Sequence, residues 1–100
     1  MLPDFVAVHR RALTALDVLT PSERECLAAK FMALRNLPAE EWARQGVRQT
    51  QPPIHVVRVT NNLLVFFSVL PEDRFLIQDF VRQETLDRFF THPQKPVVQT

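Results

Sequence analysis

The chain is organised around the segment from Ile54 to Val81, which reads IHVVRVT, NN, LLVFFSVL, PED and RFLIQDFV in succession. Three apolar runs rich in Val, Ile and Phe are separated by two short turn signals, Asn-Asn and Pro-Glu-Asp. Runs of this length and composition, with such turns between them, are typical of consecutive β-strands joined by tight hairpins. The segment therefore predicts a three-stranded antiparallel meander.

The middle run, residues 63–70, is apolar on both of its alternating sets of side chains. One set is Leu63, Val65, Phe67 and Val69, and the other is Leu64, Phe66 and Leu70. A strand with one face in water would alternate apolar and polar residues. We therefore expect a central strand covered on both faces, by other parts of the chain or by a partner.

Length and composition exclude several classes of function. A chain of 100 residues allows one domain. The net charge of +1 gives no general attraction to nucleic acid or anionic membranes. Cys26 is the only cysteine, which excludes an intramolecular disulfide and a cysteine-based zinc site. Gly46 is the only glycine, which excludes a P-loop and a dinucleotide-binding turn. We predict no cofactor and no metal.

The N-terminal half predicts two helices. Residues 11–19 have apolar side chains at helical spacing, with Ala12, Leu13, Leu16 and Leu19 as the expected buried stripe. The sequence Thr20-Pro21-Ser22-Glu23 is a capping box with proline in the first turn, so a second helix begins there. Its expected buried residues are Leu27, Phe31 and Leu34, and Pro38 stops it after Leu37. The two helices should form an αα-hairpin.

The remaining segments give weaker signals. Residues 4–9 fit either a short strand or the start of the first helix. Residues 39–45 fit a short helical turn that carries Trp42, and residues 46–53 resemble a loop leading into the sheet. Residues 83–90 predict a short amphipathic helix, after which two prolines end regular structure.

The order of these elements resembles the RelE/ParE superfamily of bacterial toxins. FVAVHRRALTALDVLTPSERECL, followed by Pro38, is similar to the opening strand and two helices of that family. HVVRVTNNLLVFFSV is similar to its paired strands, and RFLIQDFVRQETLDRFF to its final strand and terminal helix. The resemblance covers residues 4–90 and favours a strand over residues 4–9.

The resemblance implies an α+β fold, in which a short N-terminal strand and an αα-hairpin pack on a three- to four-stranded, mainly antiparallel sheet followed by a short C-terminal helix. We expect a single domain over residues 1–92 and a mobile tail over residues 93–100. Asp4 and the basic cluster at residues 9–11 interrupt the first apolar stretch, which argues against a signal peptide, and no run could span a membrane. A cytoplasmic location follows.

Ribosome-dependent nucleases of this superfamily place basic side chains and a proton-transferring Tyr or His around a phosphate, because the cleavage needs charge stabilisation and a proton acceptor. Arg58 and Arg82 match two of the basic positions, and His55 or His92 could serve as the base. Three family positions depart from the pattern, because Val56 replaces a Lys, Leu64 replaces an Arg, and Phe89 or Phe90 replaces the terminal Tyr. The chain contains no tyrosine.

Three functions remain open. The first is a toxin that binds a macromolecular target, as ParE-like relatives bind DNA gyrase, and the incomplete nuclease set favours it. The second is a ribosome-dependent mRNA endonuclease with substituted groups. The third is a protein-interaction module without toxicity.

The resemblance also implies a cognate antitoxin as partner, with a homodimer as a further alternative and no membrane contact. Candidate partner-binding residues are Trp42, Leu86, Phe89 and Phe90. Each candidate has an ordinary structural explanation. Trp42 could be a lid on the core, and the C-terminal helix could fold back on the meander. Asp79, which alternation places on an apolar face with Ile77, is expected to pair with an Arg such as Arg48 or Arg58.

Overall fold

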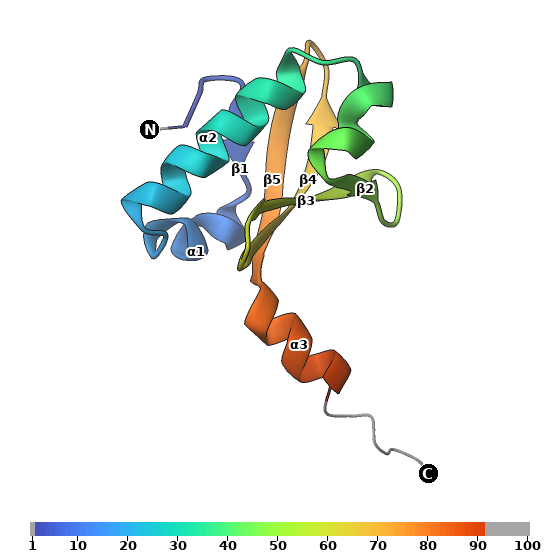
Figure 1. Cartoon of the computed structure of the whole chain (residues 1–100). Coiled ribbons are helices and arrows are strands. Elements are labelled where there is room, and N and C mark those ends of the chain that lie inside the picture. The colour runs from blue at the N-terminus through green and yellow to red at the C-terminus, as the bar shows by residue number, and fades with distance from the viewer. Residues whose placement is uncertain (1, 92–100) are drawn as a thin grey trace.

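A computed structural model of the chain describes residues 2–91, with side chains as far as Arg88 (Figure 1). In chain order the elements are β1 (Val6–Val8), η1 (Arg10–Ala12), α1 (Leu13–Asp17), α2 (Pro21–Arg35), η2 (Ala39–Gln45), β2 (Val47–Gln49), β3 (Ile54–Thr60), β4 (Leu63–Leu70), β5 (Arg74–Arg82) and α3 (Gln83–Thr91), where η1 and η2 are 3-10 helices. The predicted α+β class and the β3–β4–β5 meander are confirmed.

The sheet has five strands in the order β1-β5-β4-β3-β2, so the apolar strand β4 is central as predicted. β1 pairs parallel with β5, whereas the other pairs are antiparallel. The expected count of three to four strands was too low, because β2 lies in a segment predicted to be a loop. Gly46 ends η2 with a φ of 86° and redirects the chain so that Val47 lies beside Val57 of β3.

The capping box at the start of α2 is confirmed. The hydroxyl of Thr20 accepts a hydrogen bond from the backbone N–H of Glu23 (3.1 Å), and the Glu23 carboxylate accepts one from the backbone N–H of Thr20 (2.9 Å). The predicted buried residues Leu27, Phe31 and Leu34 are all fully buried. Two orphan donors of the first turn are thereby satisfied, which sets where the helix begins.

The first helix differs from its prediction. The chain enters it through the 3-10 turn η1, and α1 itself has only five residues. Leu13, expected in the buried stripe, is 48% exposed, whereas Ala12 and Leu19 are buried. A 3-10 turn advances three residues per turn rather than 3.6, so an apolar stripe counted at pure α-helical spacing is rotated out of place.

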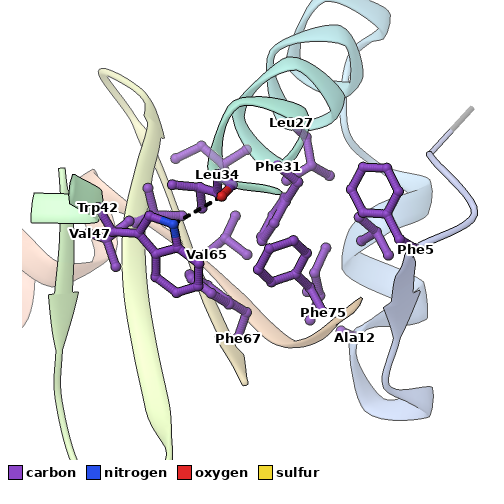
Figure 2. Close-up of a cluster of buried hydrophobic side chains, with 14 of the residues drawn as sticks. Phe5, Ala12, Leu27, Phe31, Leu34, Trp42, Val47, Val65, Phe67 and Phe75 are labelled. Carbon is purple, nitrogen blue, oxygen red and sulfur yellow. Dashed lines mark hydrogen bonds between the residues drawn. The ribbon is translucent and has the colours of Figure 1, made fainter. Parts of the chain in front are cut away.

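The hydrophobic core lies between α2, η2 and one face of the sheet (Figure 2). The ring of Phe31 packs edge-on against Phe67 at 5.0 Å between centroids, and is tilted against Phe75 at 5.2 Å. Trp42 closes the core beside η2, where its indole N–H donates to the carbonyl of Leu34 (3.0 Å). Trp42 is therefore a lid on the core, with its one polar atom satisfied.

The described chain covers the second face of β4 only in part, so of the two expected sources of cover the partner stays a prediction. Its alternate side chains Leu64 and Phe66 are half-buried, and neither belongs to the buried cluster or to the side chains packed against it. Val69, on the side of β4 that faces α2 and η2, is also 44% exposed. The apolar composition of β4 therefore exceeds what residues 2–91 cover.

The C-terminal segment forms the predicted helix α3, which continues from β5 and projects away from the body of the domain (Figure 1). It does not fold back over the meander. His92 and the predicted tail at residues 93–100 lie outside the described residues. Within the described part of the chain, no helix has the length and apolarity needed to cross a membrane.

Candidate interaction surface

The strand register divides the side chains of the meander between two faces. Residues directly opposite one another in an antiparallel pair share a face. Val56 of β3 lies opposite Phe66 of β4, and Leu64 of β4 lies opposite Val81 of β5. We use the name open face for the side away from α2, whose residues are Ile54, Val56, Arg58, Leu64, Phe66, Ser68, Leu70, Arg74, Leu76, Asp79 and Val81. The covered face is the side that packs against α2 and η2.

The open face is concave at its centre. A depression of about 360 Å³ is lined by Arg11, Ile54, Phe66, Gln78, Asp79 and Val81. Its floor is apolar and its rim is polar. Such a combination is typical of a surface that contacts another molecule, because apolar contact supplies affinity and the rim supplies orientation.

A β-bulge in β5 creates part of this rim. The register slips between Phe66 and Phe67, so that Asp79 faces Phe66 and Gln78 is the extra residue. The Gln78 amide donates to the hydroxyl of Ser68 (3.1 Å) and accepts from the Arg11 guanidinium (2.7 Å). Through Gln78, the bulge therefore connects η1 to the edge of the open face.

The bulge also overturns the prediction for Asp79. Simple alternation placed Asp79 on the apolar face with Ile77 and required an arginine partner. Instead Asp79 is exposed, its carboxylate accepts from the backbone N–H of Phe80 (2.9 Å), and no salt bridge to it is present within residues 2–91. A single inserted residue moves every later side chain to the opposite face.

Arg11, Arg48 and Arg58 lie around the open face without a carboxylate partner among the described residues. Arg11 bonds to Gln78, and Arg58 donates to the carbonyl of Asn61 (3.1 Å) and to the side chain of Gln83 (2.7 Å). Arg48 lies opposite Val56 and is exposed. Among the described residues, no carboxylate lies within 4.0 Å of any of the three guanidinium groups. The rim therefore carries three arginines together with the exposed carboxylate of Asp79, so its positive charge exceeds its negative charge.

Arg82 lies on the covered face, because it is opposite Leu63. Its guanidinium makes two hydrogen bonds to the carboxylate of Glu23, one of them at 3.1 Å. These bonds, together with the one from Thr20, lower the pKa of Glu23 from 4.5 to about 2. Glu23 in turn raises the pKa of Arg82. The pair connects the start of α2 to the end of β5.

His55 also lies on the covered face, opposite Phe67. Its ring stacks on Phe67 with centroids 5.4 Å apart and meets the edge of Trp42 at 5.8 Å. Its Nδ1 atom is buried and has no hydrogen-bond partner within residues 2–91. A depression of about 390 Å³ beside η2 is lined by His55, Trp42, Gln49 and Glu40, among others. His55 therefore packs against aromatic side chains at the edge of the hydrophobic core.

The predicted catalytic residues are thus not brought together. Arg58 lies on the open face, whereas Arg82 and His55 lie on the covered face at different ends of the sheet. The fourth candidate, His92, is outside the described residues. No group of three or more His, Cys, Asp or Glu side chains within residues 2–91 could hold a metal ion. The described geometry offers no composite site for bond cleavage from this set.

The predicted partner-binding residues also lie in different parts of the fold. Trp42 is 9% exposed and closes the core. Leu86 is half-buried on α3 and is not part of the core cluster. Phe89 and Phe90 lie on α3, with side chains beyond the described set.

Sequence reasoning missed Gln78 and Arg48 as rim residues. A bulge leaves no signal in the alternation of a strand, and Arg48 lay in a segment predicted to be a loop.

No protein-family model, no curated protein and no solved structure matched the chain.

Proposed function

We propose that this chain is the toxin-like component of a bacterial type II toxin–antitoxin module of the RelE/ParE type. It acts in the cytoplasm by binding a macromolecular target, and a cognate antitoxin neutralises it. The order of elements supports this proposal, because a strand, a helical pair, an antiparallel meander and a C-terminal helix follow one another as the resemblance implies. A target of the ParE type, DNA gyrase, is the leading candidate.

The composition of the open face carries the choice of binding over cleavage. Val56 and Leu64 lie opposite Phe66 and Val81 there, at positions where nuclease relatives carry basic residues. Of the two matching arginines, only Arg58 is on this face, and His55, the one histidine of the meander, is on the other. Phosphate cleavage needs clustered cations and a proton acceptor at one point. An apolar, concave face with a basic rim is better suited to docking.

A growth assay tests the proposal. Induced expression of the chain in a bacterial host should arrest growth, and Phe66→Asp should relieve the arrest because it places a charge at the centre of the docking surface. Val18→Asp is the matched control, because Val18 is 70% exposed and lies outside the open face. Circular dichroism of both purified variants checks that they fold.

Two biochemical assays separate the targets. A gyrase-binding toxin should produce double-strand breaks in a supercoiling reaction that contains gyrase, and should leave ribosome-bound mRNA intact. Ribosome-dependent mRNA cleavage that Arg58→Ala or Arg82→Ala abolishes would contradict the binding mechanism. A chain without effect on growth contradicts toxicity itself.

A further inference from the structure

The start of α3 is capped by the turn between β3 and β4. The backbone carbonyl of Asn62 accepts from the backbone N–H of Gln83 (2.9 Å), and its side-chain oxygen accepts from the backbone N–H of Glu84 (3.2 Å). The Asn62 amide donates in return to the Glu84 carboxylate (3.3 Å). Asn62 therefore satisfies first-turn donors of α3 from a distant position in the sequence.

Arg58 contacts both sides of this cap. Its guanidinium donates to the backbone carbonyl of Asn61 (3.1 Å), in the turn that carries Asn62, and to the side-chain oxygen of Gln83 (2.7 Å), the first residue of α3. The Gln83 amide donates in turn to the carboxylate of Asp87 (3.0 Å), one helical turn further on. One guanidinium group therefore connects β3, the turn and the first turn of α3.

The direction of α3 depends on these hydrogen bonds more than on packing. Figure 1 shows α3 continuing outward from β5, and no side chain of residues 83–88 belongs to the hydrophobic core or packs against it. Isolated helices shorter than about 12 residues are marginal in water, and α3 has nine. Loss of the hydrogen bonds at its start should therefore loosen the helix.

Arg58 also belongs to the open face, where it lies directly opposite Leu64 of β4. Both oxygens that accept from its guanidinium are uncharged, and a hydrogen bond to a carboxylate is stronger than one to a neutral acceptor. Asp79 of the same face accepts from the backbone N–H that follows it and forms no ion pair with Arg58. A carboxylate placed beside Leu64 would therefore compete with Gln83 for the guanidinium.

We propose that Arg58 is a positioning residue that couples the open face to α3. A partner that brings a carboxylate to the open face beside Leu64 draws the guanidinium away from Gln83, and the first turn of α3 then loses this connection to the sheet. Binding at the open face thereby changes the order of α3. This coupling does not depend on the proposed function, because it concerns hydrogen bonds within the free chain.

A carboxylate introduced into the full chain tests the proposal without a partner. Leu64→Glu places an acidic side chain directly opposite Arg58, and Leu64→Gln is the matched control, because glutamine has nearly the same shape without the charge. Hydrogen exchange of the Asp87 and Arg88 amides, which bond to the first turn of an α-helix at these positions, should be about tenfold faster in Leu64→Glu than in Leu64→Gln.

The core strands supply the internal reference for this measurement. The amide of Val65, a fully buried residue of β4, should exchange at the same rate in both Leu64 variants. Equal exchange of α3 in the two variants overturns the proposal. Faster exchange that extends to Val65 also counts against it, because the whole domain would then be destabilised.

Removal of Arg58 shows whether the new carboxylate acts through it. In an Arg58→Ala background α3 should already exchange faster, and Leu64→Glu and Leu64→Gln should then give equal rates. A difference that persists without Arg58 overturns the coupling.

The cap itself is tested at the two adjacent asparagines. Asn62→Ala removes the side-chain oxygen that accepts from Glu84 and should speed exchange of the Asp87 and Arg88 amides about fivefold. Asn61→Ala is the matched control, because Asn61 contacts Arg58 through its backbone carbonyl, which alanine retains. An equal effect of both substitutions contradicts the role of Asn62 as the cap on which the coupling depends.

Discussion

The two faces of the β3–β5 meander differ in cover rather than in composition. On the covered face, Phe67 is fully buried against rings from α2, η2 and β5. On the open face its neighbour Phe66 is half-buried and lines a depression. Both side chains come from one apolar run, so hydrophobicity alone cannot say which of them the fold uses. A strand that is apolar on both sides therefore indicates that both sides are to be covered, but residues 2–91 need not supply all of that cover.

The largest expected difference is between these two phenylalanines. Phe67→Ala should lower the free energy of unfolding by about 3–5 kcal/mol, because it removes a fully buried ring and leaves a cavity. Phe66→Ala should cost about 1 kcal/mol under conditions where the chain is monomeric. Urea denaturation followed by the fluorescence of Trp42, the only tryptophan, measures both. Equal losses would show that the open face is covered in the folded chain.

The lid of the covered face should give the next effect. Trp42→Phe keeps an aromatic ring in place and removes the indole N–H that donates to Leu34 and Leu37. We expect a loss of about 2 kcal/mol, from the lost indole hydrogen bonds and from lost volume, although the carbonyl of Leu34 keeps the N–H of Leu37 as a donor (3.2 Å). Because this variant has no tryptophan, circular dichroism in urea is the suitable probe. A neutral result would mean that neither the indole hydrogen bonds nor the lost volume contributes to stability.

The ion pair on the covered face should depend on acidity. A carboxylate whose folded pKa is lowered contributes stability above its unfolded pKa and loses it as pH falls through its folded pKa. For Glu23 the loss therefore occurs between about pH 4.5 and about pH 2. At neutral pH, Glu23→Gln should cost about 1–2 kcal/mol, an amount that allows for solvent screening of this partly exposed pair.

Unfolding of the wild type and of Glu23→Gln across this pH range measures that contribution, and the two stability curves should converge at low pH. Arg58→Ala is the matched control on the open face, since within residues 2–91 its guanidinium bonds only to neutral groups. A difference between wild type and Glu23→Gln that stays constant down to pH 2 would contradict the lowered pKa of Glu23.

We expect the smallest change in the free energy of unfolding for a substitution in the arginine rim of the open face. Arg48→Ala should change the unfolding free energy by less than about 0.5 kcal/mol at low protein concentration, because this side chain is exposed and has no carboxylate partner among the described residues. Repeating the measurement at high concentration sharpens the comparison. A destabilisation that appears only then is the effect expected of self-association.

Much of the fold was predictable because its signals are local. The capping box at Thr20 needs only residues within one turn, and the structure contains both of its hydrogen bonds. The turns of the meander likewise depend on a few neighbouring residues. The predictions that were wrong depended on contacts or geometry outside the local segment. β2 exists because β3 lies beside it, and Leu13 is exposed because a 3-10 turn precedes it.

The site was less predictable than the fold. Arg58 lies within β3 and Arg82 is the last residue of β5, and the two lie on opposite faces. Their separation depends on register, and register depends on bulges that strand periodicity does not encode. The same bulge moved Asp79 to the open face. Resemblance could name these residues, but it could not place them on a common surface.

The sequence by itself determined the type and order of the elements, because capping boxes, turn residues and apolar runs act over a few neighbouring residues. It also determined that β4 would be apolar on both sides. Only the tertiary structure decided which side packs against α2, which arginines lie on each face, and that α3 is held outward by Asn62. Those features depend on contacts between residues far apart in the chain, and local pattern contains no record of such contacts.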